Sequence, residues 1–339
     1  MTTSLSLGKI RGLSEIADHN GILAMTALDH RQSLRRALEQ ANPQNASYEA
    51  VVDFKLQVLL HLAPRSTAVL IDPIYGLAEA LVKGYIPGQR GFIVSLEETG
   101  YVDEDGERLS KIEHWWSIAK IKRIGASAVK ILLHYHPRSK TASRQEDFIS
   151  GAARACEQLD IPLIVEPISY SLPDEPKKGT ADFARIRPQL VIETARRLAP
   201  LGVDLLKCEF PVDVAHEGDP SAWADHCSQL TDVIAIPWVL LSAGVEYETF
   251  REQVRIACAS GASGFLAGRA IWKEAITLQG RDRDHFLASH AIDRLNELYE
   301  IAASYARPWH LVYEEAMQAI DVSEGWHRRY GEADFVAME

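Results

Sequence analysis

Eight short runs of apolar, β-favouring residues recur along this chain, each followed by a longer stretch of helical character. Most of these runs are almost continuously apolar, which is the pattern of parallel strands covered on both faces. A strand-then-helix alternation repeated eight times predicts an α/β fold, a single (β/α)8 TIM barrel. The expected strands are Ile22 to Leu28, Thr67 to Asp72, Gly91 to Leu96, Ala128 to His134, Pro162 to Ile168, Leu205 to Phe210, Trp238 to Ser242 and Gly264 to Gly268.

The segments between these strands predict helices, several of them ending near a glycine or proline. The clearest are Tyr48 to Leu62, Ile112 to Ile124, Gln145 to Leu159, Pro188 to Leu198, Trp223 to Leu230 and Tyr247 to Ala259. An N-terminal helix, Leu7 to Ala17, is expected to cover the bottom of the barrel. A C-terminal helical extension is expected at about 279–339, where the aromatic-rich run Trp326 to Phe335 is hard to place. With no linker or break in composition, residues 1–339 are expected to form one domain, its barrel at about 20–278.

Composition narrows the classes of function. The net charge of -11 argues against a nucleic-acid surface, so an anionic substrate would need a local basic site. The four cysteines are scattered without metal-ligand spacing, which indicates reduced packing residues in a cytoplasmic protein. The N-terminus carries no apolar signal region, and no apolar stretch approaches the length of a membrane span. We therefore expect neither secretion nor a membrane partner.

Lys207 stands in the middle of the sixth predicted strand, within the run Gly202-Val-Asp-Leu-Leu-Lys-Cys-Glu-Phe-Pro211. Lysine is rarely buried without a partner, and burial favours the neutral amine over the ammonium. A neutral amine is a nucleophile that can form a Schiff base with a carbonyl substrate. The alternative is a structural lysine paired with a carboxylate such as Glu209.

Lys207 is one of a set of polar residues at or near the C-terminal ends of the predicted strands, where the active sites of such barrels lie. They are Asp29, Arg31, Asp72, Glu97, Glu98, Lys130, Glu166, Lys207, Ser242 and Arg269. Lys130 and Lys207 are expected to share a layer of the barrel interior, with Glu166 projecting between them. A second cation beside an amine favours its neutral form, and Glu166 is placed to move protons. A plain buried ion pair is the structural alternative for Lys130 and Glu166.

The last two strands predict an anion site. Ser242, Ala243 and Gly244 follow the seventh strand, and Gly268 and Arg269 follow the eighth. Small residues let backbone N–H groups approach an anion, and arginine can bind a phosphate through two nitrogens. Loops after strands seven and eight frequently bind phosphate in such barrels. If Gly244 or Gly268 is considered alone, the need for a tight turn after the strand would explain it without an anion.

Two other features carry less weight. His134-Tyr-His136 has the spacing of some metal sites, but no further ligands stand at defined spacing, so no metal or cofactor is expected. Arg31, Arg35 and Arg36 could reach a second anionic group. For Arg35 and Arg36 a solvated helix face is the preferred interpretation.

With these residues in place, the chain resembles the tagatose 1,6-bisphosphate aldolase family, class I aldolases that include the sulfofructose-phosphate aldolases. The resemblance runs from about Ile10 to Leu278. It rests on Ala27-Leu-Asp-His-Arg31, Leu70-Ile-Asp-Pro-Ile-Tyr-Gly76, Glu97-Glu-Thr-Gly-Tyr101, Ala128-Val-Lys-Ile-Leu-Leu133, Val165-Glu-Pro167, Asp204-Leu-Leu-Lys-Cys-Glu-Phe-Pro211, Leu241-Ser-Ala-Gly-Val245 and Gly268-Arg-Ala-Ile-Trp272.

The resemblance implies catalytic roles for four residues and a phosphate clamp. Lys207 matches the Schiff-base lysine, Glu166 the acid/base carboxylate, and Lys130 and Asp29 the supporting charges. Ser242 and Arg269, with adjacent backbone, match the clamp. His30 departs from the pattern, because tagatose-type members commonly carry Gln between the Asp and the Arg. That exchange leaves the stereochemistry of the sugar open.

The function implied is cleavage of a ketose 1,6-bisphosphate, or an analogue with another anion at C6, to dihydroxyacetone phosphate and an aldehyde. A sulfofructose-phosphate aldolase and a transaldolase use the same imine. A metal-dependent aldolase using the histidines and a non-catalytic sugar-phosphate sensor are the remaining alternatives. The family also implies a homo-oligomer.

Overall fold

The eight predicted strands form one closed parallel barrel. The structure is a computed structural model that describes residues 5–43, 47–104 and 107–331. The barrel strands are β1 (Leu23–Leu28), β2 (Ala68–Ile71), β3 (Gly91–Ser95), β6 (Ala128–His134), β7 (Leu163–Ile168), β8 (Leu205–Cys208), β9 (Trp238–Leu241) and β10 (Gly264–Ala267). Each strand pairs with its neighbours along the chain, and β1 pairs with β10 to close the barrel. The prediction of a TIM barrel is confirmed.

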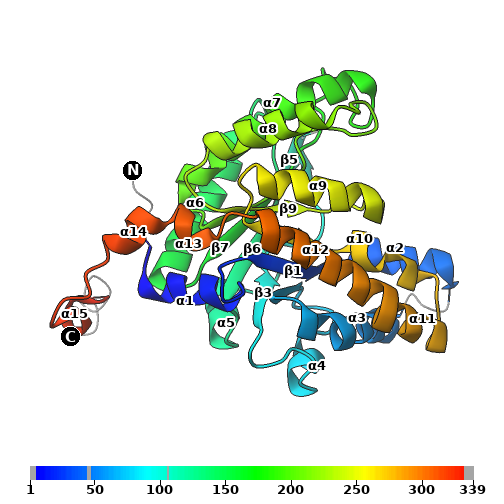
Figure 1. Ribbon diagram of the computed structural model, residues 1–339, viewed down its shortest axis with the longest axis horizontal. Helices are drawn as coiled ribbons and strands as arrows, with labels where there is room; N and C mark the ends of the chain where they lie inside the picture. Colours follow the sequence, from blue (N-terminus) through cyan, green and yellow to red (C-terminus); the bar gives the residue numbers. More distant parts are fainter. Residues whose placement is uncertain (1–4, 44–46, 105–106, 332–339) are drawn as a thin grey trace.

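Helices surround this barrel (Figure 1). They are α2 (Gln32–Ala41), α3 (Tyr48–Leu62), α4 (Leu77–Val82), α5 (Ile118–Arg123), α6 (Ala142–Gln158), α7 (Ala181–Leu198), α8 (Pro220–Asp232), α9 (Tyr247–Ala259) and α10 (Arg269–Trp272). Local capping chemistry explains several of the starts. The side chains of Ser47, Thr180 and Asp219 accept hydrogen bonds from backbone N–H groups at the first turns of α3, α7 and α8.

Helices α6 and α8 begin three residues before their predicted starts, and two other predicted starts were wrong by six or seven residues. Helix α5 begins at Ile118 rather than Ile112, because the Ser117 side chain caps it and Ile112 instead forms a β-bridge with Glu97. Helix α7 begins at Ala181, seven residues before the predicted start, and carries Pro188 inside it. Proline is a common first residue of a helix, but the hydroxyl cap of Thr180 sets this start.

A β-hairpin after β3 was not predicted. Strands β4 (Val102–Glu104) and β5 (Glu107–Leu109) pair in antiparallel fashion. Asp105 and Gly106, which stand between them in the sequence, lie outside the described residues. The strands are only three residues long, which is why their alternation gave no signal.

The bottom of the barrel is covered as predicted. Helix α1 (Leu7–Glu15) lies against the N-terminal ends of the strands, where Lys9 pairs with Asp204 just before β8 at 3.0 Å. The hydroxyl of Tyr313 donates to the backbone oxygen of Asp204, so the C-terminal region reaches the same end. That region comprises α11 (Gly280–Phe286), a π-helical segment (Leu287–Ala291), α12 (Ile292–Tyr305), α13 (Trp309–Val312), α14 (Glu314–Gln318) and α15 (Trp326–Arg329). The end of the predicted extension, 332–339, lies outside the described residues.

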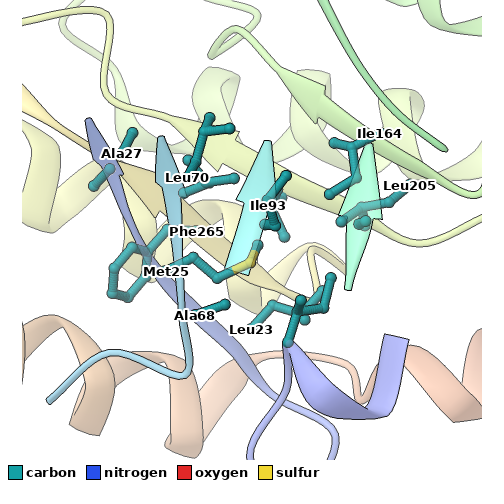
Figure 2. Close-up of a cluster of buried hydrophobic side chains, with 14 of the residues drawn as sticks. Leu23, Met25, Ala27, Ala68, Leu70, Ile93, Ile164, Leu205 and Phe265 are labelled. Carbon is teal, nitrogen blue, oxygen red and sulfur yellow. The ribbon is translucent and has the colours of Figure 1, made fainter. Parts of the chain in front are cut away.

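Apolar side chains fill the barrel interior below its upper end. Figure 2 shows part of this core, with Met25 of β1, Ile93 of β3, Ile164 of β7 and Leu205 of β8. Since side chains alternate along a strand, residues two positions after Ile164 and Leu205 project from the same faces. Among the described residues, no helix combines the length and apolar character needed to cross a bilayer.

Candidate active site

A cavity of about 590 Å³ lies at the C-terminal ends of the barrel strands. It is lined by side chains from most of the strands and their following loops. They include Asp29, His30, Arg31 and Arg36 after β1, Glu97 and Glu98 after β3, His134 of β6, Glu166 of β7, Lys207 of β8, Ser242, Ala243 and Gly244 after β9, and Gly268 and Arg269 after β10. The structure therefore brings the predicted site residues together around one opening, with Lys130 buried beneath them.

Two lysines share one carboxylate in this cavity. Lys207 Nζ lies 2.9 Å from Oε1 of Glu166, and Lys130 Nζ lies 2.8 Å from Oε2 of the same side chain. The register of β7 and β8 pairs Ile164 with Leu205, which puts Glu166 and Lys207 at the same height two residues later. The predicted position of Glu166 between the two lysines matches this arrangement.

Lys130 is the centre of a buried charge network. Its Nζ also lies 2.6 Å from Oδ2 of Asp29 and 3.3 Å from Oε1 of Glu97. Burial by itself would lower the pKa of Lys130, but the carboxylates of Asp29, Glu166 and Glu97 outweigh burial and raise that pKa. The side chain is fully enclosed at 0% exposure, so the ammonium is a fixed positive charge under the cavity floor.

The neighbouring carboxylates respond in different ways to this cation. Burial favours protonation of Asp29 and Glu166, yet Lys130 and Lys207 hold the pKa of both below its ordinary range. For Glu97 burial prevails over Lys130 and Arg31, and the pKa is raised. Glu166 is thus an anion within hydrogen-bond distance of the Lys207 nitrogen, where it can take or return a proton.

The alternative of Lys207 paired with Glu209 was wrong. Glu209 instead binds Lys178 at 2.7 Å and accepts hydrogen bonds from the backbone and hydroxyl of Ser169. Strand β8 ends at Cys208, so its alternation no longer fixes the direction of Glu209.

Asp72 does not belong to the cavity, contrary to the expectation that it faces the mouth. Its carboxylate pairs with Lys55 of α3 and accepts backbone N–H groups of Ile74 and Tyr75. Both side chains of the pair have 0% exposure. Asp72 therefore ties the β2 loop to α3 and is structural.

Small residues and one arginine form an open cradle after β9 and β10. Ala243 and Gly244 have positive φ angles of 48° and 76°, and a Cβ on Gly244 would lie 3.1 Å from the Arg269 guanidinium. The N–H of Gly268 donates to Ser242 Oγ at 3.3 Å. Within the described part of the chain, Arg269 has no carboxylate partner. Its charge is available to an anion.

His30 lies between this cradle and Asp29. Its ring meets Trp272 edge-on at 5.3 Å, and its Nδ1 is 3.9 Å from Oδ1 of Asp29. Burial, together with the charges of Arg269 and Lys207, lowers the pKa of His30 to about 4, against a smaller opposing effect of Asp29. The imidazole is neutral near pH 7 and offers hydrogen bonds rather than charge.

Arg31 and Arg36 both line the cavity. The Arg31 guanidinium lies at the cavity wall, but it binds Glu97 at 3.2 Å and Glu113 at 3.0 Å, so it organises carboxylates. Glu113 had no signal in the sequence analysis because no regular element positions it. Arg36, assigned to a solvated helix face, is exposed and also lines the cavity.

The His134 and His136 side chains have separate partners. His134 contacts Arg108, whereas Nε2 of His136 lies 3.0 Å from Glu175. In the described residues there is no group of three or more His, Cys, Asp or Glu side chains arranged to hold a metal ion.

Comparison with known families matches residues 23–274 to the model of the DeoC/LacD family aldolases. The chain belongs to this family. The match spans the whole barrel, from the first residue of β1 to just beyond α10. The family expected from the sequence motifs is confirmed.

Individual relatives of the DeoC/LacD chain cover nearly its full length. A protein of Listeria monocytogenes serotype 4a (strain HCC23), named tagatose 1,6-diphosphate aldolase, is 29% identical over 328 residues, covering 91% of this chain and 96% of its own. Tagatose 1,6-diphosphate aldolase 2 of Streptococcus agalactiae serotype III (strain NEM316) is 30% identical, with 89% of this chain and 97% of its own covered.

Solved structures of other aldolases share the fold. The fructose-bisphosphate aldolase of Slackia heliotrinireducens DSM 20476 superposes with a TM-score of 0.61 at 13% identity, covering 88% of this chain and 90% of its own. An archaeal fructose 1,6-bisphosphate aldolase gives a TM-score of 0.55 at 21% identity, covering 84% of this chain and 98% of its own. At these identities the likeness establishes the barrel architecture of this DeoC/LacD member.

Proposed function

We propose that this protein is a class I aldolase that cleaves a ketose 1,6-bisphosphate, such as tagatose 1,6-bisphosphate, to dihydroxyacetone phosphate and glyceraldehyde 3-phosphate. The observation that carries the proposal is Lys207 at the cavity floor, 2.9 Å from the Glu166 carboxylate and on the same opening as the Arg269 cradle. The names of the relatives, tagatose 1,6-diphosphate aldolases, support the choice of substrate.

In the proposed reaction the C1 phosphate binds in the cradle of Ser242, Gly244 and Arg269. Glu166 takes a proton from Lys207, whose free amine attacks the C2 ketone. Loss of water from the carbinolamine leaves a protonated imine. The C4 hydroxyl then gives up its proton, the C3–C4 bond breaks, and its electron pair moves toward the imine nitrogen to form an enamine. Protonation at C3 and addition of water release dihydroxyacetone phosphate and restore Lys207.

Lys130 and Asp29 support this chemistry. Lys130 is the fixed cation that keeps Glu166 ionised, so that the carboxylate can accept a proton and return it. Asp29 lines the cavity beside Lys130 and is the second carboxylate placed to move a proton, at the C4 hydroxyl. No cofactor takes part in this scheme.

Borohydride trapping tests the covalent step. Reduction in the presence of dihydroxyacetone phosphate should add the reduced three-carbon unit to Lys207, located by peptide mass mapping. Lys207→Ala should abolish trapping and lower cleavage by roughly four orders of magnitude or more. Lys273→Ala, a lysine paired with Glu246 away from the cavity, is the matched control and should behave as wild type. Unchanged protein mass in wild type would refute the imine.

We also propose a cytoplasmic location and assembly as a homo-oligomer. All four cysteines are buried and free, which supports a reducing compartment. The oligomer rests on the family resemblance alone. Light scattering during size-exclusion chromatography measures it directly.

A further inference from the structure

The wall of the cavity opposite the phosphate cradle is built by β3 and β6. Around the closed barrel the strand order is β1-β10-β9-β8-β7-β6-β3-β2, so β3 lies opposite β9 and β6 lies opposite β10. The cradle follows β9 and β10, and Lys207 stands on β8 between the two walls. A substrate held at the cradle and bonded to Lys207 therefore extends toward Thr99, Gly100 and His134, which line the far wall.

His134 presents a hydrogen-bond donor on this far wall. Nη1 of Arg108 lies 3.4 Å from its Nδ1. Because a guanidinium can only donate, Nδ1 accepts and the ring proton resides on Nε2. Burial, with the charges of Arg108, Lys178 and Lys130, lowers the pKa of His134 to about 4, so the ring is neutral near pH 7. The tautomer is thus set by Arg108, and among the described residues Nε2–H has no hydrogen-bond partner, so it is available to a ligand.

Arg108 brings a positive charge that no carboxylate neutralises within the described residues. Its guanidinium lies over two aromatic rings, 4.3 Å from the centre of Tyr101 and 4.7 Å from the centre of Tyr170. Stacking of this kind orients a guanidinium without cancelling its charge. Tyr101 also packs edge-on against His134 at 4.7 Å, so the three side chains form one cluster.

Gln145 of α6 fixes this cluster to the barrel. Its Nε2 donates to the backbone oxygens of both Arg108 at 3.2 Å and His134 at 2.8 Å, and its Oε1 accepts from Ser110 N. The Thr141 hydroxyl donates to the same Arg108 oxygen. Gln145 is only 1% exposed, so these bonds join the β4–β5 hairpin to β6 in a dry environment.

We propose that Arg108 and His134 form the subsite for the terminal tetrahedral anion, a phosphate or a sulfonate, at the end of the sugar remote from the cradle. This inference rests on the proposed function, since it places the second charged group of that substrate. Arg108 supplies the charge, and Nε2–H of His134 supplies a directed hydrogen bond. The β4–β5 hairpin is then a specificity element of the active site.

Arg108 stands behind His134 rather than in the cavity lining, and Arg31 and Arg36, which do line the cavity, are less suited to this role. The Arg31 guanidinium is occupied by Glu97 and Glu113. Arg36 belongs to α2, which follows β1, and β1 is the direct neighbour of β10 and its cradle. Arg36 is therefore on the wrong side to meet the far end of a ligand held by Arg269. It serves as a control, being an exposed arginine that lines the cavity on the side of the cradle.

The test compares a ketose 1,6-bisphosphate with the corresponding ketose 1-phosphate, which lacks the terminal anion. Arg108→Gln should raise KM for the bisphosphate about tenfold to a hundredfold while leaving KM for the 1-phosphate within about twofold. Arg36→Gln should leave the ratio of the two KM values unchanged. Arg108→Lys, which keeps the charge, should recover part of the loss. Sulfofructose 1-phosphate is the third substrate. If Arg108→Gln raises its KM more than that of the bisphosphate, the subsite prefers a sulfonate; the reverse result identifies a phosphate subsite.

Trapping with dihydroxyacetone phosphate, which has no distal anion, checks that Arg108→Gln is folded and keeps its imine chemistry. Equal losses on bisphosphate and 1-phosphate, or a selective loss in Arg36→Gln instead, would overturn the subsite. Failure of the proposed function is a different result, because wild type would then neither trap the triose nor cleave either ketose.

Discussion

Lys207 and Lys130 bind opposite oxygens of the same carboxylate, that of Glu166, at 2.9 Å and 2.8 Å. One of the two lysines is within reach of the cavity and the other is fully enclosed. Lys130 is locked as a cation by three carboxylates, while among the described residues Lys207 pairs with Glu166 alone. This unequal share of partners supports the proposed roles, Lys130 as a fixed charge and Lys207 as the nucleophilic nitrogen.

Replacing Glu166 by Gln should remove proton transfer while preserving shape. We expect kcat for cleavage to fall by about 10²–10⁴-fold, the range typical of a lost general acid or base. Binding of dihydroxyacetone phosphate should weaken less, since the cradle is untouched. Steady-state kinetics and calorimetry measure the two effects.

The matched control is Glu98→Gln, because Glu98 is an exposed carboxylate that lines the same cavity. It should retain most of its kcat. A Glu166→Gln enzyme as active as this control would contradict the assigned role.

The stability of the protein should fall as pH decreases from about 6.5 toward 4. The folded-state pKa values of His30 and His134 are lowered to about 4 from 6.5. Between these values the unfolded chain binds protons that the folded state does not, so the free energy of unfolding decreases with falling pH. Above pH 6.5 both states are neutral at these rings, and the full contribution to stability is present. Asp29 and Glu166, whose pKa values are lowered, extend the loss below their ordinary values of 3.8 and 4.5.

Urea unfolding at pH 7.5, 6.5, 5.5 and 4.8 measures this slope. The double variant His30→Gln/His134→Gln should show a shallower decrease than wild type over the same range. Parallel curves would mean that the two rings titrate alike in the folded and unfolded states.

Gly268→Ala should disturb both His30 and the phosphate cradle. A Cβ at this position would lie 2.8 Å from His30 Cε1 and 3.0 Å from the backbone oxygen of Ala27. We expect a loss of about 1–3 kcal/mol in stability, typical of forced overpacking, and weaker binding of dihydroxyacetone phosphate. Gly88→Ala is the control, since a Cβ at Gly88 would meet no heavy atom within 4 Å. Thermal unfolding and calorimetry should separate the two variants. Equal stability and equal binding of dihydroxyacetone phosphate would show that His30 can move to accommodate the new Cβ without loss of free energy.

Lys9→Met should destabilise the bottom of the barrel without affecting the imine. Lys9 and Asp204 are enclosed at 5% and 0% exposure, so removing the lysine leaves a buried carboxylate unpaired at a cost of about 3–5 kcal/mol. Arg11→Met breaks the exposed Arg11–Glu15 pair on the same helix and should cost at most about 1 kcal/mol. Denaturant unfolding compares them. Trapping of Lys207 should persist in both variants under native conditions. Loss of trapping in Lys9→Met alone would show that the Lys9–Asp204 pair before β8 is needed to position Lys207.

The sequence by itself determined the barrel and the faces on which its main site residues lie. Apolar periodicity is a local property, so strands such as Ala128–His134 could be placed to the residue. The two-residue repeat of a strand then fixed Glu166 on the face of Ile164 and Lys207 on the face of Leu205. Small residues after the last two strands indicated the cradle in the same local way.

Only the tertiary structure decided which charges meet. Glu166 lies within β7, whereas Asp72 and Glu209 come directly after β2 and β8, and these two bind Lys55 and Lys178. Once a strand ends, its alternation no longer directs the next side chain, and the partner is set by loops from distant parts of the chain. For the same reason, the sequence could not predict that Arg108 lies beside His134. It depends on a short hairpin whose position is fixed by Gln145 from another element.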